Sequence, residues 1–151
     1  MPVLAINKKA KFDYEILETF EAGIALSGQE VKSVRQKQAS LKGAYITINK
    51  NQEVFLINAT IPAYKMAGPL PDYNPTRPRK LLLNQKEITY LAGKLQQAGL
   101  TLVPISLYTK HNKIKLEIAL VKGKKKADKR QQIKERDDKR KIQRLLKNKF
   151  Q

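Results

Sequence analysis

Apolar and polar side chains alternate along residues 44–49 and 114–121, and each of these segments is joined by a short polar stretch to another largely apolar segment, which predicts two β-hairpins. Residues 44–49 and 54–57 are separated by a short polar stretch that is typical of a turn. Residues 101–108 and 114–121 form the second pair, and apolar residues in the later segment recur with a period of two. The turn between them contains Asn112, a residue that tolerates the left-handed backbone conformation.

The other extended segments carry weaker signals. We expect an earlier strand within residues 12–26, with a break near Gly23. Pro104 has no backbone N–H, which predicts a sheet edge or a bulge at that position. Residues 67–79 contain four prolines without periodicity, so they are interpreted as a loop with extended portions.

Two segments have helical spacing. Residues 85–98 place apolar side chains on one face and are preceded by Asn84, a good N-cap residue. Residues 28–37 are a weaker case, in which Ser27 and Glu30 have the spacing of a capping box.

Together these elements predict a mainly β fold: a small barrel of the oligonucleotide-binding type with two or three helices. Closing the sheet into a barrel removes exposed strand edges. We place this barrel in residues 1–121 and a basic tail in residues 122–151, which contain 14 basic and 4 acidic residues. All 7 prolines lie before the tail, in agreement with this division.

The composition points to a polyanionic partner. The formal net charge is +18 for 151 residues, which favours nucleic acid first and an anionic membrane second. No apolar run is long enough for a signal peptide or a membrane-spanning helix, so we expect a cytoplasmic protein that does not bind membranes.

No catalytic or metal-binding constellation is evident. The chain has no cysteine and a single histidine, His111, which excludes thiolate and multi-histidine metal sites. His111 falls in a predicted turn and is interpreted as an ordinary solvated residue. Phosphate-binding glycine loops and nucleophile elbows are absent, so we expect neither an enzyme nor a cofactor or metal.

Three basic clusters are candidates for RNA binding. Each lies near aromatic or amide side chains, which can stack on or hydrogen-bond to unpaired bases. Glu30 lies beside the second cluster, where it either caps a helix or orients an arginine, and the two roles are compatible. Its replacement is expected to weaken RNA binding without unfolding the protein. The clusters are Lys8, Lys9 and Lys11; Lys32, Arg35 and Lys37; and Arg77, Arg79 and Lys80.

The tail has the composition of a segment that is disordered alone and helical on RNA. Helix-forming residues dominate and no Gly or Pro follows Lys124, but the net charge of +10 opposes an isolated helix. An apolar stripe is formed by Ile142, Leu145, Leu146 and Phe150. The alternative is a nonspecific basic tail.

Several runs of residues resemble the SsrA-binding protein (small protein B, SmpB) family of bacterial trans-translation. The N-terminal part matches in NKKAKFDYEILETFEAGIALSGQEVKSVR, the middle in NPTRPRKLLLN and GLTLVPISLY, and the tail in GKKKADKRQQIKERD. The motifs occur in order and cover almost the whole chain.

The resemblance implies an RNA-binding adaptor built on an oligonucleotide-binding barrel. Such a protein binds the tRNA-like domain of transfer-messenger RNA and delivers it, with elongation factor Tu, to stalled ribosomes. Its tail enters the empty messenger channel near the decoding centre, where it contacts rRNA, becomes helical and senses that no messenger is present. We expect a monomer.

The family motifs and the basic clusters together assign candidate residues on two surfaces. The predicted RNA-binding residues are Asn7, Lys8, Lys9, Glu30, Lys32, Arg35, Arg77, Arg79, Lys80 and Asn84. The predicted ribosome-binding residues of the tail are Gly123, Lys124, Lys125, Asp128, Lys129, Arg130, Lys134, Arg136, Arg140, Leu145 and Leu146. Ala127 departs from the family, whose members often have an aromatic residue or His there, so a stacking contact at that position is not expected.

Without the resemblance, a basic ribosomal protein that binds rRNA permanently explains the composition equally well. An RNA-processing enzyme is a third class, which the absence of a catalytic constellation disfavours.

Overall fold

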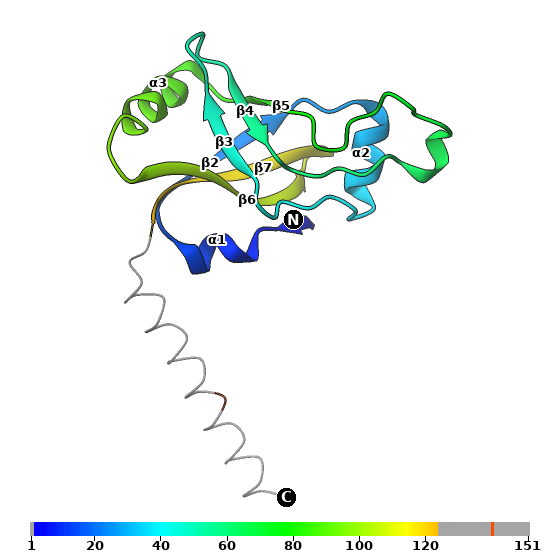
Figure 1. Cartoon of the computed structure of the whole chain (residues 1–151), viewed down its shortest axis with the longest axis horizontal. Helices are drawn as coiled ribbons and strands as arrows, with labels where there is room; N and C mark the ends of the chain where they lie inside the picture. Colours follow the sequence, from blue (N-terminus) through cyan, green and yellow to red (C-terminus); the bar gives the residue numbers. More distant parts are fainter. Residues whose placement is uncertain (1, 124–139, 141–151) are drawn as a thin grey trace, which may run out of the picture.

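The computed structural model describes residues 2–123 and 140 and consists mainly of antiparallel strands (Figure 1). The strands are β1 (Val3–Ile6), β2 (Tyr14–Ile24), β3 (Tyr45–Ile48), β4 (Val54–Ile57), β5 (Arg79–Leu82), β6 (Leu100–Lys110) and β7 (Lys113–Gly123). The α-helices are α1 (Lys8–Asp13), α2 (Gly28–Arg35) and α3 (Gln85–Lys94), and a short 3₁₀ helix η1 spans Lys65–Ala67.

Six of the strands close into a ring, which confirms the predicted barrel. Their order around the ring is β6–β3–β4–β5–β2–β7, and β7 pairs back onto β6. Strand β1 adds to β6 alongside β3. The two long strands β6 and β7 pair from Leu100 opposite Lys122 to Lys110 opposite Lys113, next to their connecting turn.

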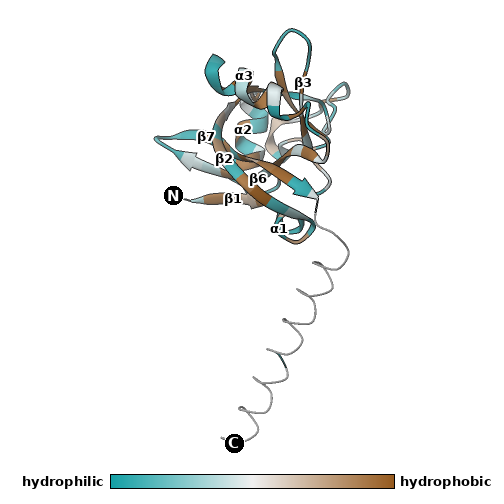
Figure 2. Ribbon diagram, turned by 90° about the vertical axis from the view of Figure 1, so that its left-hand side faces the viewer, coloured by the Kyte–Doolittle hydropathy of each residue, from teal (hydrophilic) through white to brown (hydrophobic). Residues whose placement is uncertain are grey.

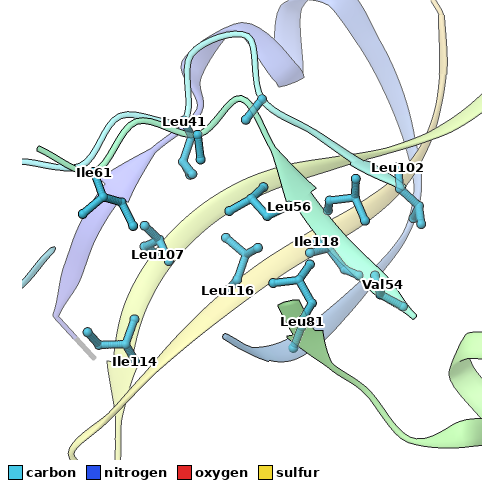
Figure 3. Close-up of a cluster of buried hydrophobic side chains, with 14 of the residues drawn as sticks. Leu41, Val54, Leu56, Ile61, Leu81, Leu102, Leu107, Ile114, Leu116 and Ile118 are labelled. Carbon is cyan, nitrogen blue, oxygen red and sulfur yellow. The ribbon is translucent and has the colours of Figure 1, made fainter. Parts of the chain in front are cut away.

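The hydrophobic core fills this ring. Leu102, Leu116 and Ile118 have no exposed surface and point into it with residues from β3, β4 and β5 (Figure 3). A smaller cluster lies on the outer face of β6 and β7, where Val103 and Val121 pack against Ala10 of α1. Because both faces of β6 are covered, its central residues are all buried instead of alternating with exposed ones. Hydrophobic stretches run along β1, β2 and β6 in Figure 2.

The two predicted hairpins are confirmed as β3–β4 and β6–β7. In the second hairpin both turn residues, His111 and Asn112, have positive φ of 51° and 62°, the backbone of a tight turn that matches strand twist. Pro104 lies where the β6–β7 register shifts, so its predicted association with a bulge is also confirmed.

The predicted break near Gly23 is wrong. Strand β2 continues through Gly23, which pairs with Leu82 of β5 on one side and Lys115 of β7 on the other. A side chain at Gly23 would place its Cβ 3.2 Å from the Cβ of Leu82. The glycine therefore permits close approach of β5 and does not end the strand.

Both predicted helices form, with shorter bounds. The Ser27–Glu30 capping box of α2 is present, and Asn84 caps α3 by accepting a hydrogen bond from the backbone of Glu87 (2.8 Å). Helix α3 ends at Lys94, four residues earlier than expected.

Three short elements, β1, α1 and β5, were not predicted. The sequences VLAI of β1 and RKLL of β5 do not alternate between apolar and polar residues, so neither displays a period of two. Helix α1 follows Asn7, whose side chain makes no capping hydrogen bond. Strand β7 ends at Gly123, so the proposed boundary at residue 121 falls inside it.

Candidate nucleic-acid interface

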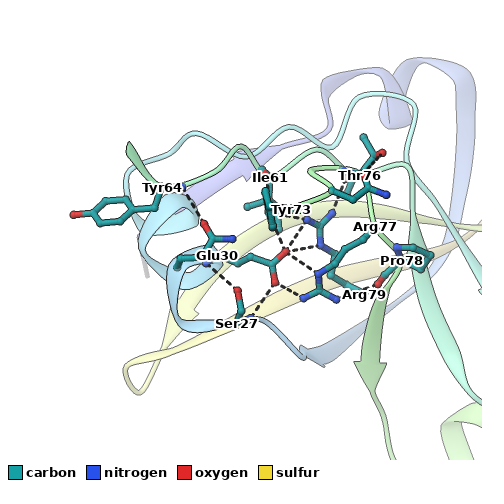
Figure 4. Close-up of polar contacts among 12 residues, drawn as sticks. Ser27, Glu30, Ile61, Tyr64, Tyr73, Thr76, Arg77, Pro78 and Arg79 are labelled. Atoms are coloured by element: carbon teal, nitrogen blue, oxygen red, sulfur yellow. Dashed lines mark hydrogen bonds and ion pairs between the residues drawn. The ribbon is translucent and has the colours of Figure 1, made fainter. Parts of the chain in front are cut away.

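Ser27, Glu30, Tyr73, Arg77 and Arg79 form a polar cluster, here called the Glu30 cluster, at the side of the barrel (Figure 4). The Glu30 carboxylate accepts from Arg79 Nη2 (2.7 Å) and Nε (3.1 Å), and from Arg77 Nε (3.2 Å) and Nη2. It also accepts from the Ser27 backbone N–H (2.9 Å) and the Tyr73 hydroxyl (3.1 Å). One carboxylate therefore joins α2 to the loop before β5 and to β5 itself.

Burial of the Glu30 cluster sets its electrostatics. Glu30 and Arg79 are fully buried, whereas the Arg77 side chain is 38% exposed. Burial alone raises the pKa of Glu30, but hydrogen bonds from Arg77, the Ser27 backbone and Arg79 outweigh it and lower the pKa from 4.5 to about 2. The carboxylate is therefore ionised throughout the physiological pH range.

This geometry changes the roles expected of two predicted RNA-binding residues. Glu30 and Arg79 have no exposed surface with which to touch a nucleic acid in this conformation. Arg79 also donates to the Ala59 carbonyl (2.8 Å), so its guanidinium is committed inside the protein. Both residues support the loop that presents Arg77, the outermost arginine of the cluster. The expectation that Glu30 can be replaced without loss of fold is not supported by this burial.

An exposed cation and an aromatic ring lie together beside the Glu30 cluster. The Lys32 ammonium lies 5.6 Å from the centre of the Tyr64 ring, within reach of a cation–π interaction. The Tyr64 backbone N–H donates to Gln29 Oε1 (2.9 Å), and its ring points away from the cluster in Figure 4. This pair has the chemistry to contact phosphate and stack on an unpaired base.

The second basic cluster meets the β6–β7 hairpin. Arg35 donates to the Asn112 carbonyl (2.8 Å) and lines a groove of about 320 Å³ together with Lys113 and Lys115. We call this the hairpin groove. Sequence reasoning did not select these two lysines, although the period of two in β7 placed Lys115 on its outward face.

A second basic groove lies beside α1, and we call it the N-terminal groove. Lys8 and Lys9 line it with Lys37 and Lys42, in a volume of about 350 Å³. The fold thus brings together lysines of two sequence clusters and adds Lys42, which belongs to neither. The spacing of these lysines along the sequence does not predict that they lie together in one groove.

Asn7 is buried and anchors the N-terminal groove. Its side chain donates to the Pro104 carbonyl (2.9 Å) and its backbone N–H donates to the Ile105 carbonyl (2.8 Å). It therefore fixes the start of α1 against β6, and one donor of its side-chain amide is committed inside the protein.

The remaining two predicted body residues lie on and just after β5. Lys80 is exposed, on the opposite face of the strand from Arg79, and forms a long ion pair with Glu53 (3.6 Å). The Asn84 side chain is occupied in capping α3.

Of the predicted tail residues, Gly123 and Arg140 are among those that the structure describes. Gly123 pairs with Tyr14 at the end of β7, and Arg140 is exposed. The other tail residues lie outside the described part of the chain.

Two features of residues 2–123 and 140 bear on other functions. No group of three or more His, Asp or Glu side chains is arranged to hold a metal ion in this part of the chain. None of the helices described there has the length and apolar character needed to cross a membrane.

Comparisons with known proteins identify the family. Residues 4–148 match the family model described as SmpB protein. The SsrA-binding protein of Trichodesmium erythraeum is 48% identical over 96% of this chain and 92% of its own length, and that of Thermosipho africanus is 51% identical over 97% and 98%. A chain of a solved structure described as "tmRNA-SmpB: a journey to the center of the bacterial ribosome" is 43% identical, covers 83% of this chain and 87% of that chain, and superposes with a TM-score of 0.68. This chain therefore belongs to the SmpB protein family.

Proposed function

We propose that this protein binds the tRNA-like domain of transfer-messenger RNA (SsrA) and delivers it to stalled ribosomes for trans-translation. The main observation behind this proposal is the sequence identity of 48% and 51%, over nearly the full length, to two proteins named SsrA-binding protein. The similar solved chain from a tmRNA-SmpB study of the bacterial ribosome supports the same partners.

The body supplies the RNA-binding surfaces in this proposal. The hairpin groove offers Arg35 with Lys113 and Lys115, and the N-terminal groove offers four lysines, each able to contact phosphate oxygens. Lys32 with Tyr64 adds a stacking surface beside Arg77. The buried Glu30 acts indirectly, because it holds Arg77 and the loop in place.

The tail supplies the ribosome-binding part. Residues 122–151 carry a net charge of +10, which suits the polyanionic wall of an empty messenger channel. Elongation factor Tu joins through the RNA complex, and the protein acts as a cytoplasmic monomer without catalytic activity or cofactor.

Binding to the tRNA-like domain can be tested by a gel shift at ~0.2 M salt, where nonspecific contacts are weak. We expect a preference of about a hundredfold over a scrambled RNA of equal length. Lys32→Ala with Arg35→Ala should reduce this preference, whereas Lys50→Ala with Lys86→Ala removes the same charge elsewhere and should not. Equal, weak binding to both RNAs would favour the ribosomal-protein alternative.

The division of labour between body and tail can be tested by truncation. Removal of residues 124–151 keeps Gly123 in its pairing with Tyr14, so the barrel stays intact. The truncated protein should bind the tRNA-like RNA normally and fail to support tagging of stalled chains. An equal loss of RNA affinity in the truncation and in the Lys32–Arg35 variant would contradict this division.

A further inference from the structure

A groove on the outer side of the barrel, between β2 and α3, has no part in the proposed RNA contacts. It encloses about 440 Å³ and is lined by residues that include Glu15, Leu17, Glu18, Tyr90 and Leu100. We call it the β2 groove. Leu17 is 44% exposed and Tyr90 is 41% exposed, so the groove presents apolar surface to solvent.

A β-bulge creates this apolar surface. In the pairing of β2 with β7, Ile16 lies opposite Val121 and Glu18 lies opposite Leu120, which leaves Leu17 as the additional residue. A bulge re-aims the side chains beside it, and here both Leu17 and Glu18 are exposed in succession. Regular alternation would have turned one of the two side chains inward.

The aromatic wall of the groove is held in a fixed orientation. The Tyr90 hydroxyl donates to both carboxylate oxygens of Glu18 (2.7 and 2.9 Å). Its ring packs at a tilt against Phe20, with centroids 6.3 Å apart, and the Lys94 ammonium lies 5.5 Å from its centre. The groove therefore exists before any partner arrives.

The charged side chains that line the groove are two glutamates and two lysines, so the groove carries no net positive charge to attract RNA. Within residues 2–123, neither Glu15 nor Glu18 forms an ion pair. Lys94 and Lys122 at the rim offset the charge of the two carboxylates, and Lys122 lies opposite Glu15 in the ladder of β2 with β7. A suitable occupant carries apolar side chains for Leu17 and Tyr90 and cations for the two glutamates.

This chain contains such a segment, and it begins beside the groove. Lys122, the residue before the end of β7, pairs with Glu15, so the tail leaves the barrel at the groove rim. Residues 142–150 combine four apolar side chains with Arg144, Lys147 and Lys149. Residues 124–141 separate this segment from β7, and for a chain of 18 residues with random-coil statistics the expected span is roughly 25 Å, which gives an effective concentration on the order of millimolar.

We propose that residues 142–150 dock reversibly in cis on the β2 groove when the protein is free. This docked state is in equilibrium with an undocked state, in which Arg140 is exposed. Docking would keep part of a strongly basic tail from binding RNA indiscriminately, and release would make the tail available to the ribosome. That regulatory meaning rests on the proposed function, whereas the contact itself does not.

The contact can be tested without RNA by paramagnetic relaxation. Because the chain has no cysteine, Gln151→Cys carries a nitroxide label at one place only. At low salt we expect the amide signals of Leu17 and Tyr90 to lose about half of their intensity or more, since tethering favours the docked state. The amide of Lys113, at the opposite end of β7, should keep its intensity.

Matched variants identify the surface. Leu17→Ser with Glu18→Gln should restore the signal of Tyr90, while Val3→Ser with Glu53→Gln, which removes the same chemistry elsewhere, should leave it weakened. Val3 and Leu17 have the same exposure of 44%. Broadening that persists in the first variant, or that affects Leu17 and Lys113 equally, would overturn the proposal. Equal broadening in a mixture of labelled and ¹⁵N-enriched chains would assign the contact to a second copy and overturn docking in cis.

Discussion

Two carboxylates of this barrel, Glu30 and Glu18, show how environment decides the role of a glutamate. Glu30 is fully buried and accepts hydrogen bonds from two arginines, a tyrosine and a backbone N–H. Glu18 is exposed and, within residues 2–123, its carboxylate accepts from the hydroxyl of Tyr90 alone. Glu30 therefore holds parts of the fold together, whereas Glu18 is accessible to a binding partner.

The two glutamates differ in how the free-energy cost of removing a charged carboxylate from water is compensated. A buried carboxylate is tolerated only when donors compensate for lost hydration, and Glu30 has such donors on three segments of the chain. An exposed carboxylate keeps its hydration and commits little energy to any one neighbour. Glu30 therefore contributes to the stability of the fold because it is buried, whereas the exposed Glu18 can contribute to binding a partner.

The largest difference between the two sites should appear on truncation. Glu30→Ala leaves the buried guanidinium of Arg79 without its counter-ion, and we expect a loss of about 3–5 kcal/mol in unfolding free energy. Urea denaturation of the variant measures this loss. Glu18→Ala is the matched control and should leave the urea midpoint nearly unchanged. A similar loss of unfolding free energy in both variants would contradict the distinction between a structural and a surface glutamate.

Lowering the pH should also reveal the stabilising role of Glu30, with a smaller loss of unfolding free energy than truncation. The pKa of Glu30 is lowered from 4.5 to about 2 in the folded protein, so its stabilisation is complete above the unfolded pKa and is lost as pH falls through the folded one. The expected contribution to unfolding free energy is about 3 kcal/mol, lost between about pH 5 and pH 2. Urea titrations over this range should show a steeper decline for the natural protein than for Glu30→Gln. Parallel curves would contradict the prediction.

The two arginines of the Glu30 cluster should differ by their burial. Arg79→Lys removes one of two hydrogen bonds to Glu30 and the geometry of the contact with Ala59, at a cost of about 1–3 kcal/mol. Arg77→Lys, at a partly exposed position, should cost less because water can replace the lost donor. Thermal or urea unfolding of the pair measures the order, and a reversed order would place the main support of Glu30 at Arg77.

The smallest effect concerns the exposed site. The hydrogen bond to Glu18 raises the pKa of the Tyr90 phenol, because ionisation would place two negative charges together. Glu18→Gln should move that pKa back toward its ordinary value of 10. Titration of the Tyr90 ring carbon signals by NMR measures the shift. Tyr108, whose pKa is raised first by burial, serves as an internal control and should not move.

The basic cluster of Arg77, Arg79 and Lys80 illustrates the limit of reading a sequence. The three residues look like one positive patch along the chain. Strand β5 turns Arg79 inward and Lys80 outward, since successive side chains of a strand point to opposite faces. Recognition of β5 as a strand would have separated them, but its sequence RKLL does not alternate between polar and apolar residues.

Local patterns determined much of the molecule. Alternation in the two hairpins, the Ser27–Glu30 capping box and the Asn84 cap are decided by neighbours in sequence, and all of them are present in the structure. The basic tail and the family motifs are likewise properties of the chain itself. Interactions between residues a few positions apart need no tertiary context.

The tertiary structure decided which of these residues meet. Glu30 finds Arg77 and Arg79 across nearly 50 positions, and Lys9 shares a groove with Lys37 and Lys42. Burial of Glu30 and exposure of Leu17 follow from sheet closure and from one bulge in register. Pairing over such separations depends on how the strands are ordered around the ring, and no periodicity along the chain encodes that order.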